Sequence, residues 1–403
     1  MDVQTPAGGA AVAEGVAAGA PGVRELALVA GRHAVRADAT GRPDPETVGG
    51  IVTAGFARHF VPERYGGAAG GFAALLGAVA AVGERCASAA WNASLAAGSA
   101  RLGAYLPERG QAELWARGPD ALVAAGLVPS GRAVSDGDGW RLSGEWAYAS
   151  GAEFSDWVLL AAPSGPRDAA GGDRPGVRFF ALPRAAFTVR HTWRALGMRA
   201  TASDTVVVSD AYVPEHRSVP WERIHRGTPE PPAARCHAVP LRLVSGLLFG
   251  APALGAATAA VREWSERLRG DASAGESARL ALASAAAEVE TAGLLLARAA
   301  ETADREAPDG EGDIARDEAR NARDCAYAVE LLRQATDRLF RAAGTRVQAA
   351  GDPLQRAWRD VSCVASHVAL RFEPAALRYA AHLLTGGFER ESSGAAARLQ
   401  TRV

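Results

Sequence analysis

The spacing of apolar residues changes twice along this 403-residue chain, and this change restricts the fold more than any other feature. From residue 23 to 120, Ala, Leu and Val recur at helical intervals, with a break at Pro62. From 121 to 228, short aromatic and β-branched runs lie between turn residues, which predicts strands. From 229 to 403 the helical spacing returns. The order predicts an α+β, mainly α fold: a helical domain, a middle β-barrel domain and a helical bundle.

The elements of the middle and last zones are the clearest. The strands expected are Trp140–Tyr148, Trp157–Ala162, Val177–Leu182 and Thr205–Val208. In the last zone, apolar stripes predict four long helices: Leu241–Leu268 with a kink at Pro252, Leu280–Ala300, Ala322–Ala343, and Pro353–Phe372 after an N-cap at Asp352. Four long helices in series predict a four-helix bundle.

Composition excludes several function classes. All 44 basic residues are arginine, so mechanisms that need a catalytic lysine are excluded. Formal net charge is −1 and arginines are spread along the chain, so we expect no nucleic-acid partner. No His, Cys, Asp and Glu cluster has metal-ligand spacing, so no metal is expected. Four widely separated cysteines without a C-x-x-C pair indicate a reducing compartment, and we predict a cytoplasmic protein.

The N-terminal segment and the apolar runs bear on localisation. Residues 1–22 are rich in Ala and Gly and lack both a basic region and a long apolar core, so a disordered tail is expected rather than a signal peptide. No uninterrupted run of about 18 apolar residues occurs, so no membrane span is predicted.

Four motifs in a fixed order resemble the acyl-CoA dehydrogenase superfamily. They are Val61–Gly67, Leu142–Gly151 followed by Asp156–Val158, Leu196–Ser203 continuing to Pro214, and Arg356–Asp360. In the second motif, Tyr148, Ala149 and Ser150 stand where the family has the aromatic, small and hydroxyl residues that contact flavin. The resemblance extends roughly from Gly50 to Leu384. It implies the acyl-CoA dehydrogenase fold, with an N-terminal helical domain, a middle β domain and a C-terminal four-helix bundle.

One departure from this family favours a particular branch. Many acyl-CoA dehydrogenases keep a catalytic glutamate soon after the Arg-Asp pair, and here Val368 occupies that place. Valine cannot accept a proton. The neighbouring His367 instead resembles two-component (group D) flavin-dependent monooxygenases. The runs Glu84–Trp91 and Tyr105–Trp115 look most like actinomycete hydroxylases of aromatic polyketides. Some phenol-hydroxylating relatives carry a second histidine where this chain has Ser99.

The resemblance implies a cofactor, partners and site residues. Reduced flavin (FMNH2 or FADH2), supplied by a separate NAD(P)H:flavin reductase, would react with O2 to form a C4a-hydroperoxide. The substrate would be a small aromatic molecule. The protein would form a homotetramer, or at least a dimer. His367 and Ser150 are the predicted catalytic residues, with a Ser150 hydrogen bond to flavin N5 contributing about 1 kcal/mol. The predicted cofactor-binding residues are Tyr148, Ser150, Trp193, Arg199, Arg267 and Arg346, the last from a neighbouring subunit.

Several functions stay open at this point. The first is hydroxylation of an aromatic natural-product intermediate of polyketide or indole type, as in antibiotic biosynthesis. The second is N-oxygenation of an amino sugar or other amine, which Ser99 favours because a nucleophilic nitrogen needs no activating base. An acyl-CoA dehydrogenase and a non-catalytic scaffold are further alternatives.

Overall fold

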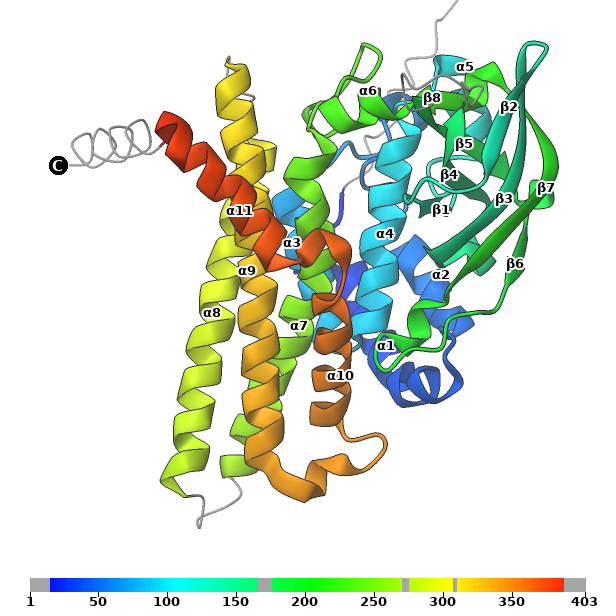
Figure 1. Cartoon of the computed structure of the whole chain (residues 1–403). Coiled ribbons are helices and arrows are strands. Elements are labelled where there is room, and N and C mark those ends of the chain that lie inside the picture. The colour runs from blue at the N-terminus through cyan, green and yellow to red at the C-terminus, as the bar shows by residue number, and fades with distance from the viewer. Residues whose placement is uncertain (1–14, 165–175, 270–274, 307–309, 388–403) are drawn as a thin grey trace, which may run out of the picture.

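The computed structural model describes residues 15–164, 176–269, 275–306 and 310–387, which form three parts in the predicted order (Figure 1). A β-sheet and a long helical bundle lie on opposite sides of the N-terminal helices, with α4 (Ala87–Gly103) near the centre. The predicted α+β, mainly α fold is confirmed.

Small residues allow α4 to lie between the other parts. The N-terminal helices are α1 (Pro21–Thr40), α2 (Pro45–Thr53), η1 (Glu63–Tyr65), α3 (Phe72–Gly83), α4 and α5 (Glu108–Leu114). Most of α4 is Ala, Ser or Gly, and it is buried on nearly all sides. A helix that is buried all round lies in a core rather than at its edge, so both the bundle and the sheet approach α4 closely.

The predicted tail, residues 1–22, extends too far. Residues 1–14 lie outside the described part of the chain, but α1 already begins at Pro21. Val16 is buried, and its amide donates a hydrogen bond to Nδ1 of His59 at 3.1 Å. One apolar side chain and one hydrogen bond therefore fix a segment whose composition alone predicts disorder.

The middle part is a mixed, mostly antiparallel sheet, in which β4 pairs in parallel with both β1 and β2. Its strands are β1 (Val123–Gly126), β2 (Arg132–Asp136), β3 (Gly139–Ser150), β4 (Trp157–Ser164), β5 (Gly176–Pro183), β6 (Thr188–Arg190), β7 (Ser203–Pro214) and β8 (Ser218–Pro220). Their order is β6-β7-β3-β2-β4-β5-β8, with β1 parallel to β4. The four predicted strands are confirmed. Pairing between the described strands runs from the short β6 to the short β8, and closure of the sheet into the predicted barrel stays a prediction.

The bundle follows the connecting helix α6 (Trp221–Arg226). It contains α7 (Leu241–Arg269), α8 (Glu276–Asp304), α9 (Glu311–Ala343), α10 (Pro353–Ala365) and α11 (Phe372–His382). The predicted N-cap is confirmed, because Asp352 accepts from the amides of Leu354 and Gln355. The helix α7 continues through Pro252.

The predicted fourth helix is broken. α10 ends at Ala365, a short 3₁₀ turn η8 (Val368–Leu370) follows, and α11 begins at Phe372. His367 has an extended backbone, and its side chain caps the turn by accepting from the amide of Ala369. A single continuous helix would place His367 on the same face as Asp360. Because the helix ends at Ala365, the two residues do not share a helix face. A side chain that accepts from a nearby backbone amide offers that amide an alternative to the helical hydrogen bond, which favours the end of the helix here.

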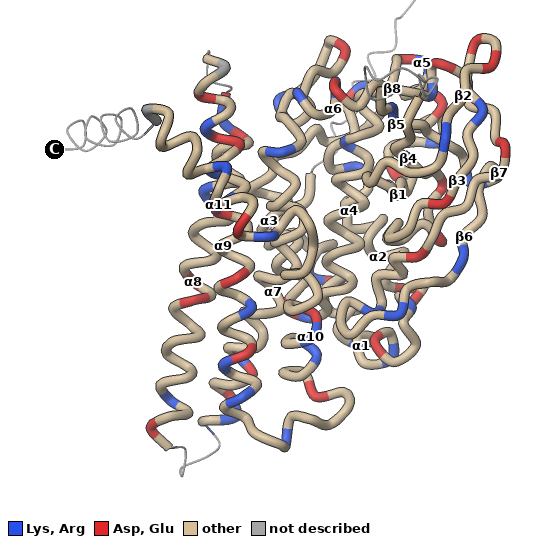
Figure 2. Tube along the Cα trace, viewed as in Figure 1, with Lys and Arg blue, Asp and Glu red and all other residues tan. Residues whose placement is uncertain are grey.

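Two helices, α7 and α8, are long and apolar enough to cross a membrane by length and composition. In α7, 72% of the most apolar stretch is buried, as expected for the core helix of a bundle. In α8 only 28% of the corresponding stretch is buried, and charged positions are interspersed along the helix (Figure 2). Some apolar side chains of α8, such as Leu280 and Leu294, are exposed.

The crossing of α3 and α7 depends on two glycines. A Cβ on Gly255 would lie 2.2 Å from the carbonyl oxygen of Ala80, and one on Gly83 would lie 2.9 Å from the carbonyl oxygen of Pro252. Both distances are too short for a side chain, so the two backbones are in direct contact.

We predict that Gly255→Ala lowers the free energy of unfolding by about 1–3 kcal/mol, because the helices must move apart. Gly293→Ala on α8 is the matched control, since its Cβ would meet only Leu254 at 3.8 Å. The control should be neutral or stabilising by up to about 1 kcal/mol through helix propensity. Thermal and urea unfolding measure both effects, and equal stability of the two variants would contradict the prediction.

Candidate active site

An apolar cavity of about 510 Å³ lies where the sheet, α4 and the bundle meet. Its wall includes Trp91 and Ser99 from α4, Tyr148 and Ser150 from β3, Trp193 and Met198 from the segment before β7, Phe249 from α7, and His367. Its size is typical of sites for cofactors and small ligands. The structure therefore brings together four of the predicted site residues: Tyr148, Ser150, Trp193 and His367.

An irregularity in β3 turns Tyr148 toward the mouth of this cavity. The pairing of β3 with β7 shifts register between Trp146 and Ala149, and Tyr148 between them has a positive φ of 64°. Its ring is 73% exposed and meets the Trp193 ring edge to face, with centroids 6.3 Å apart. Bulges commonly redirect a side chain next to a functional site. The following residues, Ala149 and Ser150, are buried.

Ser150 belongs to a row of hydroxyl groups. The indole nitrogen of Trp91 donates to its Oγ at 3.0 Å, and the same Oγ lies 2.7 Å from Oγ of Ser203. Ser203 lies 2.7 Å from Oγ1 of Thr201, which donates to the carbonyl oxygen of Met198 at 2.9 Å. A solvent-facing role for Ser150 is thus excluded, because its hydroxyl is buried and bonded at two sides.

Two side chains of α10 hold the turn that ends this row. The carboxylate of Asp360 accepts from the Met198 amide at 2.6 Å. Arg359 donates to the carbonyl oxygen of Leu196 at 2.8 Å and pairs with Asp38 at 2.7 Å. A Cβ on Gly197 would lie 2.1 Å from the Arg359 carbonyl oxygen, so the turn lies directly on the α10 backbone. Burial raises the pKa of Asp360 to about 6.

His367 enters the cavity as a neutral side chain. Its ring packs on Phe249 with centroids 4.0 Å apart and meets Trp91 at 5.8 Å. Burial among these groups lowers the pKa of His367 to about 4. Because Nδ1 accepts from the Ala369 amide, at 3.2 Å, the neutral ring carries its proton on Nε2. That nitrogen has no hydrogen-bond partner within the described ranges and is left as a donor for a ligand. A neutral catalytic imidazole could either accept a phenol proton or donate a hydrogen bond, and in this tautomer Nε2 is placed to donate.

Comparison with known proteins identifies the family. Residues 247–372 match the family described as acyl-CoA dehydrogenase, C-terminal domain. Over 334 residues the chain is 30% identical to the oxygenase component of an FADH2-dependent resorcinol hydroxylase from a Rhizobium species, covering 77% of this chain and 80% of that protein. The chain belongs to the oxygenase components of the flavin-dependent monooxygenases, within the acyl-CoA dehydrogenase superfamily.

Solved structures agree with this assignment. The 3-HSA hydroxylase from Rhodococcus sp. RHA1 superposes with a TM-score of 0.83 and 25% identity, covering 91% of this chain and 96% of that one. XiaF from a Streptomyces species, solved with FADH2 and glycerol, gives a TM-score of 0.81 and 26% identity, covering 90% and 95%. This oxygenase thus has the predicted fold and is a reduced-flavin monooxygenase.

The cavity of this oxygenase has no carboxylate in its described wall. Val368, in the place of the dehydrogenase glutamate, lies at the cavity with an exposed side chain. Ser99 is buried in the same wall, so no imidazole stands at that place. The described wall therefore offers no carboxylate base for the α-proton removal that an acyl-CoA dehydrogenase requires.

The two aromatic residues and three arginines predicted to bind the cofactor do not all line one cavity. Arg199 lies in a second pocket of about 510 Å³ beside the cavity, with Arg42 and Arg194. Trp193 lines both spaces. Arg42 pairs with Glu153 and Asp204, whereas Arg194 and Arg199 have no ion-pair partner in the part of the chain described. An apolar pocket next to two free cations suits a planar ring with an anionic tail.

Arg267 and Arg346 do not line the cavity of their own chain. Arg267 pairs with Glu263 at 2.9 Å and with Asp352 at 3.0 Å. Arg346 is exposed in η7 (Gly344–Gln348), at the end of the bundle that holds the α9–α10 connection (Figure 1). Their predicted contact with a cofactor stays a prediction that needs a second subunit.

Sequence reasoning missed three residues of this region. Trp91 was recognised only as part of a family motif, yet it bonds Ser150. Phe249 supplies the surface under His367. Arg101 is 1% exposed in the cavity wall and is bonded to the carbonyl oxygen of Cys236 and to the Tyr105 hydroxyl. A single arginine within the Ala, Ser and Gly run of α4 was the available indication.

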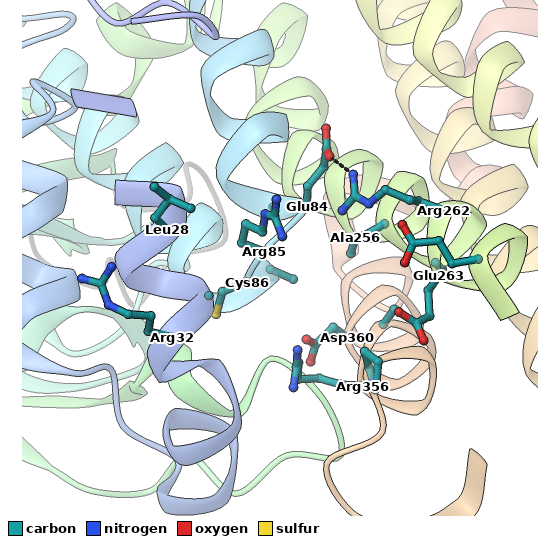
Figure 3. A pocket seen from close by; sticks show the side chains of 18 residues that line it. Leu28, Arg32, Glu84, Arg85, Cys86, Ala256, Arg262, Glu263, Arg356 and Asp360 are labelled. Atoms are coloured by element: carbon teal, nitrogen blue, oxygen red, sulfur yellow. Dashed lines mark hydrogen bonds and ion pairs between the residues drawn. The ribbon is translucent and has the colours of Figure 1, made fainter. Parts of the chain in front are cut away.

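A separate polar cavity of about 610 Å³ lies between α1, the α3–α4 junction, α7 and α10 (Figure 3). Glu84 and Arg262 form an ion pair across it, and Arg356 and Asp360 approach from α10 (Figure 3). Opposite charges are mixed throughout its wall, so it is a poor site for an apolar ring. Asp360 therefore has this polar space on one side and the Met198 turn on the other.

We predict a pH-dependent stability difference between the wild type and Asp360→Asn. The pKa of Asp360 in the fold, about 6, exceeds its unfolded value of about 3.9, so its stabilising contribution is complete below pH 4 and lost as pH rises through 6. Asparagine keeps the acceptor for the Met198 amide. The free energy of unfolding of the wild type relative to the variant should fall by about 3 kcal/mol between pH 4 and 7. Urea titrations at each pH measure it; a constant difference would contradict it.

Proposed function

We propose that this oxygenase transfers one oxygen atom from O2 to a small aromatic molecule, using FMNH2 or FADH2 delivered by a separate NAD(P)H:flavin reductase. The observation that carries the proposal is the apolar cavity, which combines a buried hydroxyl row with a neutral histidine donor and has no carboxylate in its described wall. The relatives include enzymes named for resorcinol and for indole-3-acetate. Actinomycete aromatic polyketides and indoles are the substrate classes that we favour.

Each wall of the cavity has a part in this proposal. Bound reduced flavin supplies the activation of O2. Tyr148 and Trp193 would hold the flavin ring, and the Ser150 hydroxyl would bind its nitrogen edge. Trp91 and Phe249 exclude water from the cavity. His367 would supply a hydrogen-bond donor, Nε2–H, to the bound ligand.

The anionic tail of the flavin needs cations. Arg199 and Arg194, beside Trp193, are placed to receive a phosphate next to the ring. We retain Arg346 and Arg267 as contacts from a neighbouring subunit, since both lie at an end of the bundle away from their own cavity. Bidentate pairing between guanidinium and phosphate is the physical reason in each case.

Such contacts require self-association, and we propose a homotetramer. The outer face of α8 carries the exposed apolar side chains Leu280 and Leu294, at 66% and 74% exposure. These two side chains on the outside of the bundle would be covered by packing of α8 against a second subunit. We also propose a cytoplasmic location, which agrees with four cysteines that form no disulfide.

N-oxygenation of an amine is the second candidate. It is favoured by Ser99, which places a hydroxyl where some phenol hydroxylases have histidine, and by the His367 tautomer, which cannot accept a proton at Nε2. A nucleophilic nitrogen needs no activating base, whereas a phenol benefits from one.

Reconstitution with a generic flavin reductase, NADH and ¹⁸O2 tests the function. Panels of phenols, indoles and amines should include compounds that gain one ¹⁸O atom, and the class that turns over separates the two candidates. Formation of H2O2 alone across all panels, together with no measurable binding of reduced flavin, would overturn the proposal.

We predict that His367→Phe, which keeps a ring against Phe249 but has no donor, uncouples the reaction. Loss of the Nε2 donor should lower the yield of product per NADH about tenfold or more and raise H2O2 correspondingly, while reduced flavin still binds. Cys363→Ala is the control, since Cys363 lines the same cavity without a hydrogen bond to His367. Product and H2O2 are measured together; equal coupling in both variants would remove His367 from the mechanism.

A further inference from the structure

The hydroxyl row beside the cavity has a fixed direction. Thr201 donates its only proton to the carbonyl oxygen of Met198, at 2.9 Å, because a carbonyl oxygen can only accept. Thr201 must then accept from Ser203, at 2.7 Å. Ser203 has used its proton in that bond, so it accepts from Ser150, at 2.7 Å. Starting from the carbonyl, every proton in the row is assigned.

The opposite end of the row is compatible with this direction. The indole nitrogen of Trp91 can only donate, and it donates to Oγ of Ser150 at 3.0 Å. The row therefore runs from Trp91 through Ser150, Ser203 and Thr201 to the Met198 carbonyl. A donor at one end and an acceptor at the other satisfy all three hydroxyls without conflict, and aligned hydrogen bonds strengthen one another.

The Met198 carbonyl is itself held in place. It also accepts from the Trp193 indole at 2.9 Å, and the Met198 amide is bonded to Asp360 at 2.6 Å. Ser150, Thr201 and Ser203 are all buried, so water does not readily replace any bond in the row. Reversing the direction would leave the Met198 carbonyl without the Thr201 bond.

We propose that this row makes Ser150 a hydrogen-bond acceptor toward the cavity, so that the oxygenase binds reduced flavin in preference to oxidised flavin. The Ser150 proton points to Ser203, one lone pair receives Trp91, and the remaining lone pair is available to the ligand. N5 of reduced flavin carries a hydrogen and can donate to it, whereas N5 of oxidised flavin offers only a lone pair. Trp91, Ser203 and Thr201 are positioning residues in this scheme. The inference rests on the proposed flavin site.

The preference for reduced flavin can be measured as the ratio of the two Kd values. One hydrogen bond gained by the reduced form and absent from the oxidised form corresponds to roughly a fivefold to tenfold difference in Kd. A tenfold tighter affinity for the reduced form raises the two-electron potential of bound flavin by about 30 mV. This direction suits an enzyme that takes up reduced flavin from solution and must release the oxidised product.

The experiment reverses the row by removing its last hydroxyl. In Thr201→Val, Ser203 loses its acceptor and turns its proton toward Ser150, which frees the Ser150 proton for the cavity. Thr201→Ser keeps the hydroxyl and is the matched control. Kd values for oxidised and for anaerobically reduced FMN and FAD are measured by equilibrium dialysis, and the potential of the bound flavin by dye equilibration.

The wild type and Thr201→Ser should bind the reduced form at least about fivefold more tightly. In Thr201→Val the ratio should fall to one or below, with a matching fall in potential. Ser203→Ala, which also releases the Ser150 proton, should behave like Thr201→Val and gives a second route if one variant does not fold. Equal ratios in the valine and serine variants, or a wild type that prefers oxidised flavin, would overturn the inference. Binding of neither form would instead overturn the flavin site itself.

Discussion

The bond between the Asp360 carboxylate and the Met198 amide, 2.6 Å long, joins the bundle to the sheet at the edge of the cavity. Arg359 adds a bond to the carbonyl oxygen of Leu196, and Gly197 between these residues lies directly on the α10 backbone. The turn at Met198 ends the hydroxyl row of Ser150, while α10 leads directly to His367. One contact thus helps to fix the relative positions of Ser150 and His367, the two groups that we propose to act on a bound flavin.

Burial of polar groups gives the cavity its chemical character. An apolar wall removes charge from His367, and the amide of Ala369 decides which ring nitrogen keeps the proton. The same exclusion of water keeps the three hydroxyls beside Ser150 bonded to one another. The protein therefore presents a donor from the bundle and an acceptor from the sheet. In the proposed function, the acceptor would bind reduced flavin and the donor would serve the substrate or oxygen.

Much of the fold was predictable because it depends on local patterns. Periodic apolar residues located the strands and the long helices, and Asp352 before Pro353 located the start of α10. The end of that helix was not predictable, since the apolar stripe continues to Phe372. In the structure His367 lies beyond the helix end, has an extended backbone and caps the next turn. Val16 likewise is ordered by contacts with residues far along the chain.

The sequence by itself determined the order of the three parts, the motifs of the family and the candidates Tyr148, Ser150, Trp193 and His367, because side-chain spacing and short motifs are properties of neighbouring residues. Only the tertiary structure decided what these residues do. The Trp91–Ser150 bond joins positions 59 apart and the Asp360–Met198 bond positions 162 apart. The direction of a proton depends on which partners surround a group in space, and folding brings those partners together.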